Sequence, residues 1–433
     1  MHKQFRRNLM AMAVASALWG ASGMASAAGF ALIEQSASGM GNAFAGAAAT
    51  SEDASAMWFN PASMSKLQGG MQFTAGGHLI DLSAEFHNSG GSSNPVALGN
   101  PGGGNGGDAG GMSPIGNFYF VAPIGDQLHF GVGVNTPFGL KTEYDDNWIG
   151  RFQGIKSDLA TINVNPAISF KVNDTFSVGV GLDYQFIDAE LTNAIVAGPG
   201  NEGRAKLKAD DSAWGWNAGV LIEPVKGTRI GASYRSKIDY TLDGTASATS
   251  ASGATIADNP VHGDITMPES FSISLAQALG EKWEFLADAT FTKWSAINRV
   301  NVLNSNTGAT VDTLVLDFDD SWRYSVGVNY KLNDGWKLRA GVALDQTPVK
   351  DATTRTVRMP DNDRTWVSFG AQVKIKETGR LDFGYAHLFI KDADINNTRD
   401  QTGFPIPGAA TSHVVGTYEG SVNIFSMTYS MAF

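Results

Sequence analysis

The chain has 433 residues, of which 51 are glycine, 24 are phenylalanine, 10 are tryptophan and none is cysteine. The lack of cysteine excludes disulfides, zinc ribbons, iron–sulfur clusters and thiol nucleophiles. The formal net charge is −11. Binding to a phosphate backbone needs a basic surface, so we expect no nucleic-acid partner.

The first 27 residues have the features of a secretory signal peptide. A basic stretch from Lys3 to Arg7 precedes an apolar stretch that begins at Leu9, and Ala25-Ser26-Ala27 matches the small-residue pattern of a cleavage site. We predict a signal peptide over residues 1–27. The alternative is an uncleaved anchor, but the apolar run is shorter than the ~20 residues that a membrane-spanning helix needs.

From about Met71 to Phe433 apolar and polar residues alternate. In one stretch Trp283, Phe285 and Phe291 share an apolar face, while the residues of the opposite face are polar except Leu286. Alternation with a period of two predicts β-strands. No apolar run in this part of the chain approaches ~20 residues, so we expect no membrane-spanning helix. The strands of a soluble β-sandwich alternate in the same way, so the connections between strands must distinguish a sandwich from a membrane barrel.

The predicted connections fall into two classes. Six are short turns, near residues 124–127, 172–174, 224–227, 279–281, 332–335 and 376–379. Seven are longer and polar or glycine-rich, near residues 88–111, 139–156, 193–208, 245–262, 299–311, 347–362 and 393–412. Thirteen connections imply fourteen strands. An even number of strands, with short turns at one end and long loops at the other, predicts an all-β, antiparallel outer-membrane barrel over residues 71–433.

The last strand fits this prediction. Phe425, Met427 and Tyr429 alternate with serine and threonine, and the chain ends on Phe433. Resemblance to other outer-membrane proteins implies that the barrel assembly machinery reads this ending. An amphipathic terminal strand that closes a soluble barrel is the alternative.

Residues 28–70, which we call the plug segment, do not alternate. They are rich in alanine, glycine and serine. We predict a helix over residues 37–48 and a second helix capped by Ser51, which ends at Asn60-Pro61 because the residue before proline avoids helical backbone angles. A wide barrel would otherwise have an open lumen, so we expect this segment to lie inside it. A periplasmic tail is the alternative.

Several peptides together resemble the FadL-type long-chain fatty acid transporters. They occur in order along nearly the whole mature chain: Ala28-Gly29-Phe30, residues 36–46, Asn60-Pro61-Ala62, residues 120–124, residues 136–144, Met267-Pro268-Glu269, residues 347–349 and residues 359–366. The resemblance implies a fourteen-stranded barrel with a hatch inside it. Hydrophobic molecules would pass by passive diffusion through an apolar tunnel and leave sideways into the bilayer.

The resemblance also implies the sites of this transport. The exit lies where the third strand kinks inward, at Thr136, Pro137, Phe138 and Gly139, with the hatch gate Asn60-Pro61-Ala62 against it. The mature N-terminus, Ala28, Gly29 and Phe30, reaches into the tunnel. From the residues themselves, proline removes a ladder hydrogen bond and interior glycine marks a bend, although Pro137 simply ending the strand is an equal alternative.

A fatty-acid carboxylate needs a cation or several hydrogen-bond donors in its tunnel. By our alignment Asn193 and Asp319 stand near the positions of two basic residues of the best-known family member. Arg151, Arg323 and Arg364 remain as possible carboxylate partners, or as wall arginines paired with nearby acids. Trp148 and Ile149 are expected on an exposed loop, as part of an apolar patch or as loop packing.

Two transport hypotheses therefore stay open, uptake of long-chain fatty acids and uptake of neutral hydrophobics such as monoaromatic hydrocarbons. A general diffusion porin is a third. Enzymatic activity is not expected, because no Gly-x-Ser-x-Gly stands before a helix and the histidines are scattered. We expect no cofactor and no metal. Outer-membrane lipid and lipopolysaccharide are the expected surroundings.

Overall fold

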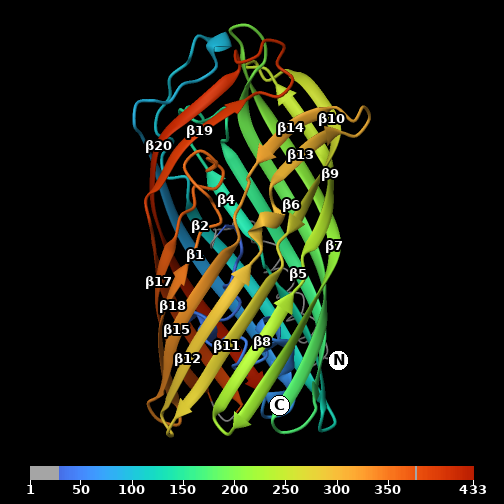
Figure 1. Cartoon of the computed structure of the whole chain (residues 1–433), viewed down its shortest axis with the longest axis vertical. Helices are drawn as coiled ribbons and strands as arrows, with labels where there is room; N and C mark the ends of the chain where they lie inside the picture. Colours follow the sequence, from blue (N-terminus) through green and yellow to red (C-terminus); the bar gives the residue numbers. More distant parts are fainter. Residues whose placement is uncertain (1–28, 376–377) are drawn as a thin grey trace, which may run out of the picture.

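A computed structural model describes residues 29–375 and 378–433 of the chain; the predicted signal peptide and Ala28 lie outside the described residues. Antiparallel strands form one closed barrel (Figure 1). The first strand, β1 (Gln72–Asn88), pairs along its whole length with the last, β20 (Thr411–Ala432), from Gln72↔Ala432 to Asn88↔Gly416. The predicted fold class is thereby confirmed.

Fourteen strands make the wall, as predicted, and six of them are divided into two segments. The undivided strands besides β1 and β20 are β2 (Gly111–Ile124), β5 (Lys156–Lys171), β6 (Phe176–Val196), β7 (Glu202–Val225), β16 (Trp336–Asp345) and β17 (Arg364–Ile375). The divided strands are β3 (Leu128–Asn135) with β4 (Gly139–Glu143), β8 (Thr228–Arg235) with β9 (Ile238–Thr249), β10 (Thr255–Met267) with β11 (Ser270–Leu279), β12 (Trp283–Thr292) with β13 (Arg299–Asn304), β14 (Thr310–Val315) with β15 (Ser321–Lys331), and β18 (Gly379–Ile390) with β19 (Ala393–Asp400).

Because successive side chains of a strand point to opposite faces, the alternating apolar and polar residues lie on the two faces of the wall. In β20, Phe425 and Met427 are 52% and 54% exposed on the outside, while Thr428 is buried on the inside. Apolar residues on the outer face and polar residues on the inner face are what a barrel in lipid requires. The exception in β12, Leu286, is buried on the inside, where its side chain lies against Gly46 of the plug segment.

The five predicted short turns that lie wholly within the described residues are at one end of the barrel, whereas the sixth, near residues 376–379, lies partly outside the described residues. Several predicted long connections are wrong. Near residues 193–208, strand β6 continues to Val196 and β7 begins at Glu202. Residues 245–262 are largely β9 and β10, residues 299–311 are largely β13 and β14, and β19 occupies the start of residues 393–412. These extensions lie toward the long-loop end of the barrel (Figure 1). In some of them the alternation is reversed relative to a strand in lipid: Asn301 and Asp394 are exposed, while Val300 and Ile395 are buried inside.

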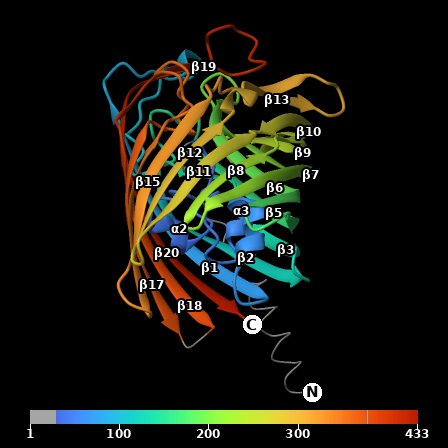
Figure 2. The ribbon, with the colours of Figure 1, turned by 60° about the horizontal axis from the view of Figure 1, so that its bottom comes forward.

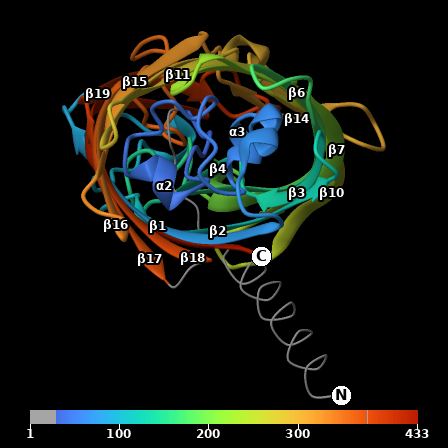
Figure 3. The same ribbon diagram turned by 90° about the horizontal axis from the view of Figure 1, so that it is seen from below.

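The plug segment lies inside the barrel, seen from the short-turn end in Figures 2 and 3. Its helices are short: α2 (Ala37–Met40), α3 (Ala56–Phe59) and the 3₁₀ helix η1 (Pro61–Lys66); two further 3₁₀ turns, η2 (Val96–Leu98) and η3 (Trp294–Ala296), belong to the wall and its loops. The predicted helix over residues 37–48 is wrong beyond Met40. Ala43 and Phe44 take positive φ angles of 54° and 55°, which reverse the chain.

The second predicted plug helix starts later than expected. Ser51 caps no helix, and α3 begins at Ala56. Its predicted end before Pro61 is confirmed, and Asn60 has a further role there. The Asn60 side chain accepts a hydrogen bond from the Ala62 N–H and so caps η1, with proline at the first helical position, where a missing N–H costs nothing.

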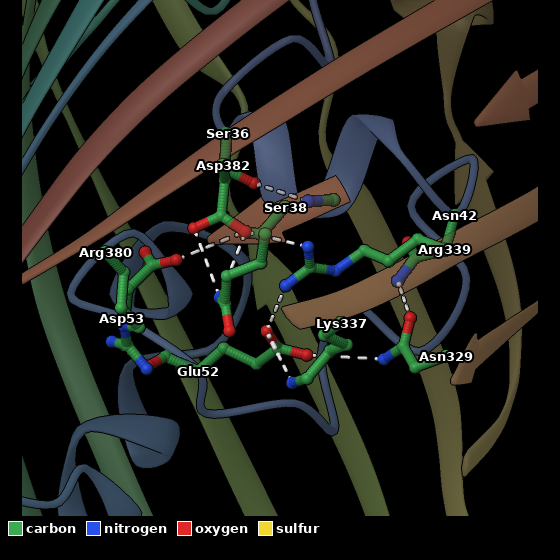
Figure 4. A network of polar contacts seen from close by, with 12 residues as sticks. Ser36, Ser38, Asn42, Glu52, Asp53, Asn329, Lys337, Arg339, Arg380 and Asp382 are labelled. Carbon is green, nitrogen blue, oxygen red and sulfur yellow. Dashed lines mark hydrogen bonds and ion pairs between the residues drawn. The ribbon is translucent and has the colours of Figure 1, made fainter. Parts of the chain in front are cut away.

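A buried charge network joins the plug segment to the wall (Figure 4). Arg339 of β16, whose side chain is fully buried, lies 2.5 Å from Glu52 of the plug and 2.7 Å from Asp382 of β18. Lys337 adds a contact of 3.1 Å to Glu52. Burial alone would raise the pKa of the Glu52 carboxyl, but the nearby cations outweigh burial and hold the pKa far below 4.5. Removing one partner of such a network leaves a buried charge unpaired, which is strongly destabilising.

Glycines in the strands let the plug approach the wall closely. A Cβ on Gly219 of β7 would lie 2.1 Å from the Asn60 Oδ1 atom, and one on Gly179 of β6 would lie 2.4 Å from the Ala62 nitrogen. In this position Asn60 donates to the Val220 carbonyl (2.9 Å) and to the Ala48 carbonyl (2.7 Å). Any larger residue in place of Gly179 or Gly219 must therefore displace the turn around Asn60.

We predict that Gly219→Ala destabilises the protein by about 1–3 kcal/mol, because the added methyl forces Asn60 away from two of its hydrogen-bond partners. The measurement is the temperature at which the purified barrel unfolds in detergent, read from its change in gel mobility. Gly77→Ala is the matched control, since a methyl on this strand glycine would meet nothing within 4 Å. Equal unfolding temperatures for the two variants would contradict the close packing of plug and wall.

Candidate functional site

The third strand is interrupted between β3 and β4, over Thr136, Pro137 and Phe138. Strand β2 pairs with β3 only up to Phe118↔Val134, and in the described chain no ladder joins residues 111–117 of β2 to β4. Beyond the interruption, backbone bonds link the loop before β2 to the end of β4 and the residues after it: Glu143 donates to the Ala109 carbonyl (3.0 Å), Asp145 to the Gly106 carbonyl (3.0 Å) and Ile149 to the Gly104 carbonyl (2.8 Å). The strand is interrupted around Pro137, which cannot donate to a ladder.

The plug segment supplies backbone partners to the interruption. The Leu32 N–H donates to the Pro137 carbonyl (2.8 Å), and the Gly139 N–H donates to the Phe30 carbonyl (2.8 Å). These two bonds flank an antiparallel bridge between Ala31 and Phe138. The Gln35 side chain donates to the Thr136 carbonyl (2.8 Å). The start of the plug segment therefore pairs with the wall where the wall does not pair with itself.

Four aromatic side chains meet beside this bridge. The ring of Trp294 lies 4.9 Å from that of Phe30, 6.3 Å from that of Phe138 and 6.0 Å from that of Phe318, centroid to centroid. Trp294 belongs to η3, in the break between β12 and β13, and Phe318 lies between β14 and β15. The three contacts are edge-to-face, the favourable arrangement for aromatic pairs. We call these four residues the aromatic partition.

Two cavities lie on either side of the aromatic partition. The upper chamber, of about 190 Å³, is lined mainly by aliphatic side chains, including Leu140, Leu159, Leu191, Leu207 and Leu242, and reaches Phe30 and Phe318. The lower chamber, of about 170 Å³, reaches Phe138 and Trp294 and is bounded by Ala31, Leu32, Pro61 and Pro137. The plug residues Phe30–Ile33 thus stand between the two chambers and next to the interrupted strand.

A third cavity, the outer vestibule, lies toward the long-loop end. It has a volume of about 180 Å³ and is lined by residues that include Phe152, Ile195 and Gln401. It shares Leu191, Leu207, Val302, Arg358 and Arg399 with the upper chamber. The cavities therefore form a series from the outer vestibule through the upper chamber to the lower chamber.

The three arginines singled out in the sequence lie in different places. Arg151 pairs with Glu202 (2.8 Å), and Arg364 pairs with Asp361. Arg323 lines the lower chamber, donates to the Ala43 carbonyl (2.9 Å) and lies over the Trp366 ring at 4.9 Å. No carboxylate in the described chain lies within 4 Å of Arg323.

Other predicted residues are placed as follows. Asn60 and Ala62 contact β7 and β6, and the direct contacts to the interruption come from Phe30, Leu32 and Gln35 instead. Pro61 borders the lower chamber together with Pro137. Trp148 and Ile149 are not exposed: Trp148 is fully buried and stacks on Tyr144 at 3.9 Å. No local pattern in the sequence marks Trp294 or Phe318, because their contact depends on two strand breaks far from Phe30 in the chain.

A buried carboxyl accompanies the pairing stretch of the plug. Glu34 is 1% exposed, and its Oε2 atom has no hydrogen-bond partner in the described structure. Burial raises the pKa of the Glu34 carboxyl from 4.5 to about 7, and the more distant Arg323 and Arg364 offset only part of this effect. A folded-state pKa above the unfolded value means that the folded protein binds the proton more tightly.

We predict that the protein loses up to about 3 kcal/mol of stability between pH 4.5 and pH 7, because over this range the unfolded state ionises Glu34 while the folded state keeps it protonated. Glu34→Gln should remove this part of the pH dependence. The measurement is thermal unfolding in detergent at pH 5 and pH 8 for both proteins. The same loss of stability in Glu34→Gln as in the parent would show that Glu34 is not the group responsible.

Comparison with known proteins agrees with this architecture. Residues 18–433 match the model of the family described as outer membrane protein transport protein (OMPP1/FadL/TodX). Outer membrane protein P1 of Haemophilus influenzae is 31% identical, with 89% of this chain and 90% of that protein covered. The long-chain fatty acid transport protein of Escherichia coli O6:H1 is 30% identical, with 87% and 90% covered.

A solved structure shares the fold. The crystal structure of a Pseudomonas aeruginosa FadL homologue has a TM-score of 0.84 at 23% identity, with 94% of this chain and 100% of that chain covered. A barrel that closes with an even number of strands, carries its apolar residues on the outer face and matches outer-membrane proteins over most of its length is an outer-membrane protein. This chain therefore belongs to the OMPP1/FadL/TodX family of outer-membrane transporters of hydrophobic compounds.

Proposed function

We propose that this protein takes up long-chain fatty acids by passive diffusion through its three cavities and releases them sideways at the interrupted third strand. The observation that carries the proposal is the pairing of the plug stretch Phe30–Leu32 with Pro137 and Gly139, beside two chambers with largely apolar walls. Displacing this stretch would join the chambers to each other and to the unpaired side of β2.

A lateral exit avoids an unfavourable step for an apolar solute. Returning an alkyl chain from the protein interior to water costs about 0.8 kcal/mol for each CH₂ group, so release into the aqueous periplasm opposes uptake of a long chain. Passage between strands into lipid has no such cost. The absence of a ladder between residues 111–117 of β2 and β4 supports this route.

The contacts of the plug indicate which part of it moves. Residues from Glu52 onward are held by the buried charge network and by the close packing against Gly179 and Gly219. The stretch from Phe30 to Gln35 is held at the interruption by neutral hydrogen bonds and aromatic contacts. A net intramolecular hydrogen bond contributes only about 0.5–1.5 kcal/mol, so this stretch is the easier part to displace.

Uptake of neutral hydrophobics such as monoaromatic hydrocarbons is the second candidate. The observation that favours it is the pairing of Arg151 and Arg364 with Glu202 and Asp361, since an arginine already paired is a poor site for a ligand carboxylate. Neutral ligands need no cation. Both candidates use the same route through the cavities.

We expect the gene to restore growth on oleate in a bacterium that lacks its own fatty-acid transporter. The measurement is the growth rate with oleate or toluene as carbon source, in hosts able to metabolise each. Growth on toluene alone would select the second candidate, and growth on neither would reject both. A large steady ionic conductance in planar bilayers would instead indicate a general porin, because a lumen filled by the plug should conduct little.

Joining the plug to the interruption should stop uptake. Ala31 and Phe138 form a non-hydrogen-bonded antiparallel pair, whose ~4.5 Å Cα separation suits a disulfide. The parent chain has no cysteine, so Ala31→Cys/Phe138→Cys gives one defined bridge. We expect uptake of labelled oleate to fall at least tenfold when the bridge is oxidised and to recover on reduction.

The control for this experiment is a bridge elsewhere in the same wall. Asp394 and Thr417 are paired between β19 and β20, and their side chains are already in contact at 2.8 Å. Asp394→Cys/Thr417→Cys should leave uptake unchanged under both conditions. Unaltered uptake through the oxidised Ala31–Phe138 bridge would exclude displacement of the plug start as the opening step.

A further inference from the structure

Arg358 lies at the boundary between the outer vestibule and the upper chamber and lines both. It belongs to the connection between β16 and β17 and directly precedes Met359, the first residue of one of the peptides considered in the sequence. The residue is only 5% exposed. A long cationic side chain is thus held inside the barrel, with aliphatic walls on one side.

The hydrogen-bond partners of Arg358 are all uncharged. Its Nη1 atom donates to the Lys156 carbonyl (2.9 Å) and the Ser157 hydroxyl (3.0 Å), and its Nη2 atom donates to the Thr192 carbonyl (3.2 Å) and the Asn193 side chain (3.4 Å). The Nε atom has no partner. Within the described ranges no carboxylate oxygen lies within 4 Å of this guanidinium. The contacts therefore orient Arg358 but do not neutralise it.

The surrounding charges leave a positive excess. Arg399, the other arginine that lines both cavities, makes two hydrogen bonds to the carboxylate of Asp312 and is neutralised by it. The residues that line the upper chamber include no aspartate or glutamate. Burial and then Arg399 lower the pKa of Arg358 to about 9, so the side chain still carries its charge at neutral pH. A buried charge without a counter-charge is unfavourable, and an anionic ligand would relieve it.

We infer that Arg358 binds the carboxylate of an amphipathic ligand whose alkyl chain lies in the upper chamber. The inference rests on the proposed uptake of fatty acids and assigns the residue that recognises their charged end. The Nε–H group of Arg358 is the donor left for a carboxylate oxygen, the charge of the guanidinium strengthens that bond, and the leucines of the chamber match the chain.

The other buried arginines are less suited to this role. Arg151 and Arg364 already have carboxylate partners, and Arg399 has Asp312. Arg323 lines the lower chamber, where Asp288 and Asp345 also line the wall and disfavour a further anion. Arg355 also donates to carbonyls, but it lines neither the upper chamber nor the outer vestibule. Among the arginines of the described residues, Arg358 alone combines an uncompensated charge with a place beside the aliphatic wall.

The test compares two ligands with the same chain and different heads. Purified full-length protein in mild detergent is titrated with oleate and with oleyl alcohol, and binding is followed by the quenching of tryptophan fluorescence by a brominated chain. The parent should bind oleate at least about tenfold more tightly than the alcohol, the usual advantage of a charge-assisted hydrogen bond over a neutral one. Arg358→Gln should lower oleate affinity by about that factor and leave the affinity for the alcohol unchanged.

Two further variants complete the design. Arg358→Lys, which keeps the charge, should retain part of the preference for oleate. Arg151→Gln removes a buried arginine that already has a partner and should change neither affinity. Unchanged binding of the alcohol to Arg358→Gln also reports that the variant is folded. If Arg358→Gln does not fold, the preference for oleate over oleyl alcohol is compared between the parent and Arg358→Lys, and this comparison tests the role of Arg358.

The outcomes separate this inference from the proposed function. Equal binding of oleate and oleyl alcohol by the parent, or an unaltered preference in Arg358→Gln, would overturn the role of Arg358 while leaving uptake of hydrophobic molecules in place. Binding of neither ligand would overturn both. A preference for oleate that disappears only in Arg358→Gln supports the assignment.

Discussion

A wall that crosses a membrane must pair every backbone N–H and C=O group, because hydrocarbon offers them no other partner. Most of this barrel meets the requirement with continuous antiparallel ladders, including the closure between β1 and β20. The third strand does not, because Pro137 has no N–H and the chain leaves the ladder beside β2. Phe30 and Leu32 of the plug supply the missing backbone partners from inside. In the proposed function, the same contacts that complete the wall would also close the lateral exit.

The pairing of the plug start with the interrupted third strand explains why the arrangement with the plug start in place is the stable one. Moving the start of the plug breaks two backbone hydrogen bonds at the interruption and separates Phe30 from Trp294 and Phe138. An apolar ligand that takes the place of Phe30 restores the buried apolar contacts but not the hydrogen bonds. A ligand can shift the equilibrium between the paired and the displaced plug start only by the difference between its affinities for the two states. A passive transporter is therefore suited by a small number of neutral contacts, because a small difference in affinity can then displace the plug start.

Sequence reasoning could predict the barrel because lipid imposes a period of two on every strand that crosses it. It identified fourteen strands from residues close together in the chain. It misplaced the plug helices, since the chain turns with positive φ angles at Ala43 and Phe44, directly after Gly41 and Asn42, which pack against the strand glycines Gly370 and Gly341. It also overlooked Trp294, Phe318 and Arg358, whose surroundings are assembled by separate strands and loops. No local pattern marks a residue whose role depends on contacts so distant in sequence.

The distribution of charge along the cavities favours one orientation of an amphipathic ligand on the proposed route. In the lower chamber Arg235 and Arg323 are accompanied by Asp288 and Asp345, so the charges that line it balance, whereas the upper chamber has the uncompensated charge of Arg358. An anionic head group is therefore more stable in the upper chamber, and the alkyl chain is the part of an amphipathic ligand that can advance past the aromatic partition at little cost. On the proposed route, entry of the chain into the lower chamber would bring it to Pro137 while the carboxylate stays near Arg358. The tail would then reach the bilayer first, and the head group would follow only when the hydrocarbon already buried in lipid outweighs its interaction with the guanidinium.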